Sequence, residues 1–117
     1  MSIRTERVAG VIRELVGGLL LRDIDTSGYG LLTVTDVIMA PDLRLAKIYV
    51  SHFHSGKTNE QVLAFFEEHH KAIRMRIGAA VRLKFTPELR FYIDETLVRV
   101  ERLEELLGRI HEEEKNR

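Results

Sequence analysis

The segment from Leu31 to His52 constrains the fold of this chain most, because two stretches typical of β-strands flank a turn. Leu31 to Met39 is rich in β-branched residues, and Leu45 to His52 alternates apolar and polar side chains around Ile48 and Val50. That alternation is the period of a half-buried strand. The intervening Ala40-Pro41-Asp42 has turn chemistry, since proline presets one backbone angle and aspartate bonds to nearby backbone. The sequence therefore predicts a β-hairpin.

Two segments on either side of this hairpin have the spacing of amphipathic helices. The first runs from Thr5 to about Leu21, with apolar residues at Val8, Val11, Ile12, Leu15, Val16, Leu19 and Leu20. The second begins at Thr58, which forms a capping-box pattern with Gln61. It extends to just before Arg82, over about six turns, and a helix of this length favours a kink or break. Its expected inward residues are Val62, Phe65 or Phe66, His69, Ile73, Ile77 and Ala80.

The last third of the chain predicts one more strand and one more helix. Arg82 to Ile93 turns extended, and Pro87 places this strand at an edge or bulge because proline cannot donate to a ladder. Asp94 or Thr96 can then cap a final helix. The apolar residues of that helix are Leu97, Val100, Leu103, Leu106, Leu107 and Ile110.

The expected architecture is an α+β fold with the order α-β-β-α-β-α, in which helices cover one face of a three-stranded sheet. With 117 residues, the chain fits one domain. We expect this domain to span residues 1–111, followed by a charged tail at 112–117 that frays.

Composition excludes several classes of protein. The chain has no cysteine, which excludes disulfides and thiolate zinc sites and fits a reducing cytoplasm. No stretch approaches the roughly 18 to 20 apolar residues of a membrane span, and the first residues lack the apolar centre of a signal peptide. We therefore expect a cytoplasmic protein without membrane contact.

A net charge of zero conceals a positive segment between His69 and Tyr92, which holds six basic residues and one acidic residue, Glu88. Local positive potential attracts a phosphate backbone whatever the net charge. The candidate RNA-binding residues are Lys71, Arg74, Arg76, Arg82, Lys84, Arg90, His70 and Lys47. On charge alone, a solvated helix face with ordinary salt bridges is an equally good interpretation. Arg4, Arg7, Arg44 and Lys47 are weaker candidates because acidic residues stand near them in the sequence.

Phase along the helices and strands refines these candidates. With Ile73 and Ile77 inward, Lys71 points away from the core and Arg74 lies on a flank, free for either use. Tyr49 and Tyr92 share the outward phase of their strands, where an RNA base can stack on them. Phe85 also lies near a strand from which an aromatic ring can stack on an unpaired base. Core packing is nevertheless the preferred interpretation for Phe85 and Phe91.

No pattern in the sequence indicates catalysis. The chain has no phosphate-binding loop, no dinucleotide fingerprint and no serine in a nucleophile motif. The histidine pairs His52 with His54 and His69 with His70 do not supply the three or four ordered ligands of a zinc site. We expect no enzyme activity, no cofactor and no small-molecule substrate.

Three ordered blocks of the sequence resemble the ribosome-binding factor A family. They are Arg7-Val8-Ala9 with Gly30 to Val37, Pro41 to Val50, and Arg82 to Phe91 with Asp94, followed by the Leu103 to Leu107 stretch. The resemblance implies a type II KH-like fold and a monomer that binds the 30S subunit. It further implies contact with 16S rRNA near its 5′ end, help in pre-16S rRNA processing, and a link to growth in the cold.

Two positions depart from that family pattern. His69-His70-Lys71 stands where the family has an Ala-x-Gly helix kink, so the helix either runs straighter or bends by another device. Val100 replaces a glycine usual at the start of the final helix.

A second hypothesis is a protein-interaction module that docks through its first or last amphipathic helix. The apolar stripe of the last helix would consist of Leu97, Val100, Leu103, Leu107 and Ile110.

Overall fold

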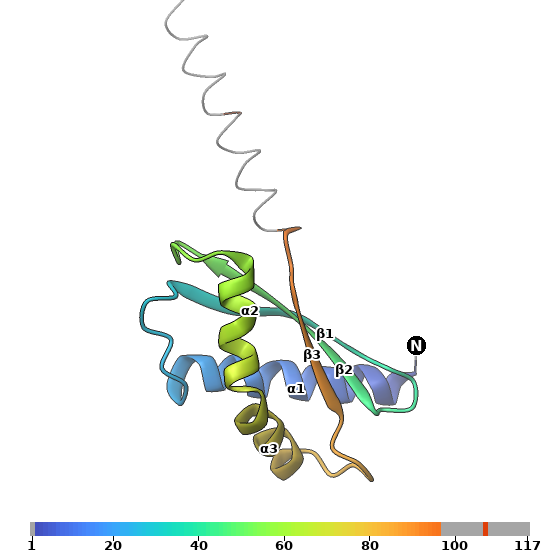
Figure 1. Cartoon of the computed structure of the whole chain (residues 1–117). Helices are drawn as coiled ribbons and strands as arrows, with labels where there is room; N and C mark the ends of the chain where they lie inside the picture. Colours follow the sequence, from blue (N-terminus) through green and yellow to red (C-terminus); the bar gives the residue numbers. More distant parts are fainter. Residues whose placement is uncertain (1, 97–106, 108–117) are drawn as a thin grey trace, which may run out of the picture.

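The computed structural model describes residues 2–96 and residue 107. Three helices and three strands follow the chain in the order α-β-β-α-α-β (Figure 1). Their bounds are α1 Ile3–Arg22, β1 Leu31–Met39, β2 Leu45–Phe53, α2 Asn59–Glu68, α3 His70–Ala80 and β3 Glu88–Ile93. The predicted α+β class is confirmed. The predicted final helix lies outside the described residues, apart from Leu107, whose side chain is 56% exposed.

The three strands form one mixed sheet in the order β1-β2-β3. β1 and β2 are antiparallel, from the Leu31–Phe53 pair to the Met39–Ala46 pair, so the predicted hairpin is confirmed. β3 runs parallel to β2 along the edge of the sheet. Pro87 directly precedes β3, where it costs no ladder hydrogen bond. Thr35 forms a bulge in β1, between Val34 and Asp36.

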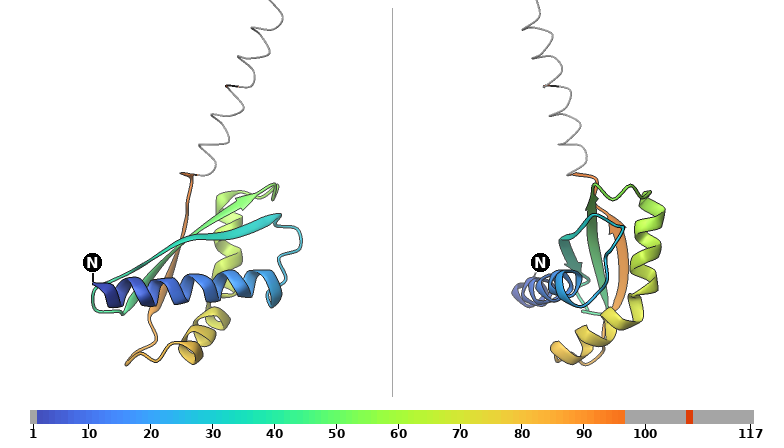
Figure 2. Two further views of the ribbon diagram at one scale, coloured as in Figure 1. Left: turned by 180° about the vertical axis from the view of Figure 1, so that it is seen from behind. Right: turned by 90° about the vertical axis from the view of Figure 1, so that its left-hand side faces the viewer.

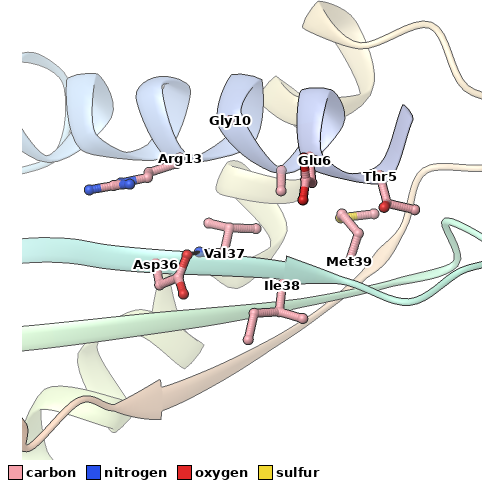
Figure 3. A pocket seen from close by; sticks show the side chains of 9 residues that line it. Thr5, Glu6, Gly10, Arg13, Asp36, Val37, Ile38 and Met39 are labelled. Atoms are coloured by element: carbon pink, nitrogen blue, oxygen red, sulfur yellow. Dashed lines mark hydrogen bonds between the residues drawn. The ribbon is translucent and has the colours of Figure 1, made fainter. Parts of the chain in front are cut away.

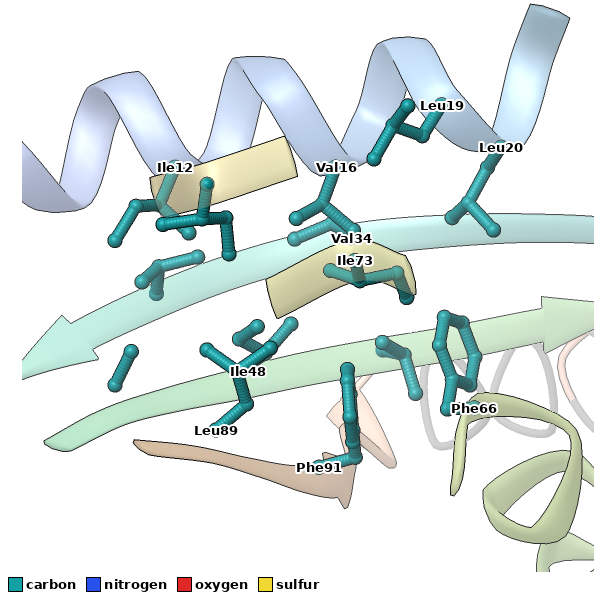
Figure 4. Close-up of a cluster of buried hydrophobic side chains, with 14 of the residues drawn as sticks. Ile12, Val16, Leu19, Leu20, Val34, Ile48, Phe66, Ile73, Leu89 and Phe91 are labelled. Atoms are coloured by element: carbon teal, nitrogen blue, oxygen red, sulfur yellow. The ribbon is translucent and has the colours of Figure 1, made fainter. Parts of the chain in front are cut away.

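The core lies on one face of this sheet. Directly paired residues of neighbouring strands share a face, and most of the buried apolar strand residues pair with one another across the three strands. The buried apolar strand residues are Leu32, Val34, Val37, Met39, Ala46, Ile48, Val50, Leu89 and Phe91. Side chains of α1 and of the α2-α3 pair pack against this face (Figure 4). Figure 2 shows α1 along β1 and α2 beside β3.

The predicted long helix is divided into α2 and α3 at His69. The predicted capping box between Thr58 and Gln61 begins α2, and Ile73 and Ile77 of α3 are buried as expected. His69 adopts φ −94° and ψ 2°, a conformation that any residue can reach without the positive φ for which glycine is needed. Its ring lies 4.6 Å from that of Phe65. The helix therefore breaks without the family glycine.

Three expected core positions are exposed. Val11 is exposed on α1 because the stripe that faces the sheet is narrower than its apolar pattern. Ala80 is exposed because it ends α3, where the chain leaves the core. Phe85 is 50% exposed because it lies in the loop between α3 and β3 and not on a strand. No helix in the described part of the chain combines the length and the apolar character needed to cross a membrane.

The two loops at the end of the sheet where β1 begins close on each other. Gly30 adopts φ +62°, and a Cβ at this position would overlap the carbonyl oxygen of Phe53. The Tyr29 ring lies 4.6 Å from Phe65 and carries the Lys57 ammonium 5.2 Å from its centroid. The two loops thus pack closely against each other, and this close approach requires glycine at position 30. We call the loops 23–30 and 54–58 with their neighbours the closed end.

Candidate nucleic-acid interface

The loop of residues 81–87 is held against α3 at the opposite end of the sheet. Arg74 donates hydrogen bonds from Nε to the Pro87 carbonyl at 3.2 Å and from Nη2 to the Thr86 carbonyl at 3.1 Å. Gly78 permits the close approach, because a Cβ there would lie 2.9 Å from Thr86 Oγ1. Pro87, the last residue of the loop, is fully buried. These contacts fix where the side chains of the loop project.

Three neighbouring hollows surround this loop. The first lies between the start of α1 and the loop, the second between the hairpin turn and the loop, and the third between α3 and the loop. They share residues, so they form one continuous surface, which we call the basic end. Its basic side chains are Arg4, Arg7, Arg44, Lys71, Arg74, Arg82 and Lys84.

The charge balance of the basic end is strongly positive. Asp42 is the one carboxylate among the described residues that line the three hollows, and its Oδ1 accepts a hydrogen bond from the Arg44 amide at 3.1 Å. None of the seven cations forms an ion pair with an acidic residue that the structure describes. A polyanion can therefore approach without displacing an internal acidic partner.

Four predicted RNA-binding residues meet at the basic end: Lys71, Arg74, Arg82 and Lys84. Lys71 is exposed on α3 as expected, and Arg82 and Lys84 are exposed in the loop. The expectation that Arg74 is free is wrong, because its guanidinium is bonded to two loop carbonyls. Arg74 thus positions the loop as well as adding charge.

Two further candidates interact with acidic side chains elsewhere. Arg76 Nη2 lies 3.3 Å from Asp23 Oδ2, near the end of α1. His70 Nδ1 lies 3.2 Å from Glu67 Oε2, and its ring meets the edge of Phe91 at 5.8 Å. Arg76 and His70 do not line the hollows of the basic end.

The remaining candidates, Lys47 and Arg90, lie on the open face of the sheet. They are register partners on β2 and β3. The next outward pair is Tyr49 and Tyr92, whose rings stack with centroids 5.4 Å apart. The outward phase predicted for both tyrosines agrees with this arrangement, and the buried position of Phe91 agrees with its expected core role. None of these four outward residues lines a hollow of the basic end in the described part of the chain.

The linear sequence makes Arg4, Arg7 and Arg44 weaker candidates than the basic residues of the positive segment. Acidic residues stand near them along the chain, yet α1 and the hairpin turn bring them to the same loop as Lys84. The sequence also favours core packing over an exposed position for Phe85, which is half exposed in the structure. The signal available in the sequence was the position of Phe85, two residues before Pro87 and outside the alternation of β3.

The other polar features are less suited to a polyanion. A hollow between α1 and β1 is lined by Glu6 and Arg13 of α1 and by Asp36, Val37 and Met39 of β1 (Figure 3). Its mixed charges give no net attraction for phosphate. Among the described residues there is no cluster of three or more side chains suited to hold a metal ion.

Asp94 joins the end of β3 to the bulge in β1. Thr35 Oγ1 donates to Asp94 Oδ2 at 2.6 Å, and the Thr96 amide donates to Oδ1 at 3.0 Å. These bonds stabilise the carboxylate and lower the pKa of Asp94 from its ordinary value of 3.8, with the Thr35 hydroxyl as the largest cause. The role of Asp94 is structural.

Comparisons with known proteins agree on one family. The model of a family described as ribosome-binding factor A matches residues 4–107. A protein of that name from Vibrio campbellii is 37% identical over 115 residues, which cover 97% of this chain and 85% of that protein. Ribosome-binding factor A from Chlorobium phaeobacteroides is 34% identical over 116 residues, which cover 97% of this chain and 99% of that protein.

Two structural comparisons extend the likeness to the fold. The crystal structure of ribosome-binding factor A from Thermus thermophilus gives a TM-score of 0.66 at 19% identity, covering 76% of this chain and 94% of that chain. A homology model of the Thermus thermophilus factor, fitted into a cryo-electron microscopy map of a 30S complex, gives 0.61 at 19% identity. That comparison covers 74% of this chain and 90% of the other.

Proposed function

This chain belongs to the ribosome-binding factor A family, and we propose that it binds the 30S subunit during late maturation, with the basic end against 16S rRNA. Members of this family are non-catalytic assembly factors. The single observation that carries the choice of surface is the convergence of seven basic side chains around loop 81–87 with one carboxylate among them.

The chemistry of the surface fits a folded RNA. Its cations come from α1, the hairpin turn, α3 and the loop, so they are spread over an area and do not read one base edge. Such a surface recognises phosphates and the shape of an RNA helix or junction. A homology model of the Thermus thermophilus factor has been fitted into a map of a 30S complex, which supports the choice of partner.

The finer part of the proposal concerns where and when the protein acts. We place its contact near the 5′ end of 16S rRNA, where it holds an immature conformation and aids processing of pre-16S rRNA in the cytoplasm as a monomer. The family resemblance supports this part.

The test compares two triple variants that remove the same number of charges. Lys71→Ala, Arg82→Ala and Lys84→Ala strip the basic end, whereas Lys47→Ala, Arg76→Ala and Arg90→Ala strip predicted candidates elsewhere. Arg74 is left in place because it holds the loop. Co-sedimentation with 30S subunits across a salt series measures affinity and its salt dependence.

We expect the first triple to lower the slope of log affinity against log salt by about two units, since each phosphate contact contributes about 0.7 to 0.9. The second triple is expected to leave the slope close to that of the parent. Equal slopes for the two triples would refute the assignment of the surface. Salt-resistant association with one protein, and none with 30S subunits, would favour the protein-interaction module instead.

A cellular test addresses processing. Cells without the protein are expected to accumulate pre-16S rRNA, most strongly in the cold, and the parent gene is expected to reverse this. The gene for the first triple variant is expected not to reverse the accumulation, whereas the gene for the second triple variant is expected to reverse it. Northern hybridisation with a probe to the 5′ precursor sequence measures the outcome, and a normal precursor level in the deletion would contradict the processing role.

A further inference from the structure

Phe85 occupies an unusual place for a phenylalanine. It stands in loop 81–87 with half of its surface exposed, and it lines two of the three hollows of the basic end. Single exposed apolar residues are ordinary, but this one lies among the cations of the basic end. Its position therefore combines an aromatic face with closely spaced positive charges.

Two cations approach the Phe85 ring directly. The Arg44 guanidinium carbon lies 4.7 Å from the ring centroid and the Lys84 ammonium lies 5.6 Å from it. Both distances are within the range of a cation–π interaction. Arg4 lines the same hollow as Phe85, Arg44 and Lys84. Three cations thus surround one aromatic platform.

The backbone beneath this platform is anchored on both sides. Arg74 holds the Thr86 and Pro87 carbonyls, and the Glu88 amide donates to the Arg44 carbonyl at 2.8 Å. The second bond ties the loop to the hairpin turn that carries Arg44. Because the loop and the turn are tied together, little ordering remains to oppose the binding of a ligand between them.

We propose that Phe85 is a stacking site for one unpaired RNA base, whose flanking phosphates contact Arg4, Arg44 and Lys84. The site deepens the proposed function and rests on it. An aromatic ring stacks on any base through its π-face, and phosphates follow a positively charged groove without base readout. Bases inside a duplex are stacked on one another and do not offer a free face, so the expected ligand is a single-stranded or bulged nucleotide.

The chain offers a direct probe because it contains no tryptophan. Phe85→Trp places a single indole at the platform, and a base stacked on it quenches the fluorescence. The probe is a short single-stranded oligoadenylate, compared with the same oligonucleotide annealed to oligouridylate. We expect saturable quenching by the single strand and little by the duplex.

The control is Leu21→Trp, because Leu21 is 79% exposed on α1 and does not line the hollows of the basic end. Quenching confined to the Phe85→Trp protein supports the site. Equal quenching of both proteins, or none in the Phe85→Trp protein, overturns it.

Affinity measurements separate stacking from charge. Phe85→Ala is expected to weaken oligoadenylate binding about tenfold, as loss of a stacked base does, with the salt slope unchanged because no cation is removed. Phe85→Tyr keeps the ring and is expected to bind like the parent, whereas Phe85→Leu keeps apolar bulk and is expected to bind like Phe85→Ala. Parent-like binding by Phe85→Leu would show that the ring is not stacked on a base.

Binding to 30S subunits distinguishes the two levels of proposal. If Phe85→Ala binds 30S subunits like the parent while the basic-end triple does not, the stacking site is refuted and the proposed function stands. If the parent itself fails to bind 30S subunits, the proposed function is refuted. Circular dichroism of Phe85→Ala confirms that any loss is not unfolding.

Discussion

The loops at the end of the sheet where β1 begins close on each other, whereas the loop where β3 begins stands between α1 and the hairpin turn with its charges exposed. At the closed end, one ring nitrogen of His52 forms a hydrogen bond with Ser55 Oγ, and the other forms one with Asn59 Oδ1 at 2.9 Å. The Lys57 ammonium there lies over a tyrosine ring. Polar groups at this end are thus engaged with their own neighbours.

At the basic end the same kinds of group are arranged differently. Within the described residues, Arg74 alone among the seven cations donates its side-chain hydrogens to the backbone, and it fixes the loop that carries Arg82, Lys84 and Phe85. The other cations make no ion pair with any acidic residue in the described part of the chain. A surface that binds a large polyanion needs cations that are held in place but not neutralised. This difference supports our proposal that the basic end binds RNA, whereas the closed end contributes to stability.

The largest expected effect of a single substitution is at the closed end. Gly30→Ala would place a Cβ against the Phe53 carbonyl and 2.7 Å from the His54 backbone, at φ +62°. Because the obstacle is backbone, we expect a loss of about 3 kcal/mol in the free energy of unfolding. Urea unfolding followed by circular dichroism measures this loss.

Gly28→Ala is the matched control, since Gly28 has φ +86° but a Cβ added there would meet no atom within 4 Å. Its expected cost is the left-handed backbone alone, about 1 kcal/mol. The 30S affinity of the folded protein is expected to stay unchanged in both variants. Equal destabilisation by the two would contradict the close approach of the loops at Gly30.

A smaller effect on stability, but a larger one on binding, is expected at Arg74. Arg74→Met removes two charge-assisted hydrogen bonds to loop carbonyls, and because this site is partly exposed we expect a cost of about 1 kcal/mol. The loop loses its position, so affinity for 30S subunits is expected to fall. Unfolding curves and co-sedimentation measure the two effects.

Two further variants separate charge from positioning at this site. Arg74→Lys keeps the charge but not the planar fork, so we expect a parent-like salt slope with faster amide exchange in residues 81–87. Arg76→Met removes an exposed ion pair with Asp23 at 3.3 Å, which contributes at most about 1 kcal/mol. If Arg76→Met lowered 30S affinity as much as Arg74→Met, the distinction between the two arginines would fail.

The hairpin and the start of α2 were predictable because their signals are local, whereas the third strand, expected from Arg82, begins only at Glu88. A two-residue alternation predicts the hairpin, and a hydroxyl followed by glutamine predicts the capping box that begins α2. The break at His69 was harder to place. The 3.6-residue pattern continues from Phe66 to Ile73 because both helices face the same core, so periodicity alone does not show where one helix ends.

The composition of the basic end could be predicted only in part. Lys71, Arg82 and Lys84 stand close together in the sequence, whereas Arg4, Arg7 and Arg44 reach them only through the packing of α1 and the hairpin. Phe85 was assigned to the core because aromatic residues are usually buried. Its exposure follows from the length of the loop, which ends at Pro87 before β3 begins.

The smallest expected effect tests how the bulge in β1 holds the residue that follows β3. Thr35→Val removes the donor to Asp94 Oδ2, so the pKa of Asp94 is expected to rise towards 3.8, and a carbon-detected NMR titration of its carboxyl measures the change. In the parent, the lowered pKa in the folded state adds stability above pH 3.8 that is lost as the pH falls through the folded pKa. Thr35→Val is therefore expected to flatten the decline of Tm in this acid range. Thr33→Val is the control, because Thr33 lies on the same strand with an exposed side chain. An equal rise of the Asp94 pKa in both variants would show that the Thr35 hydroxyl is not its cause.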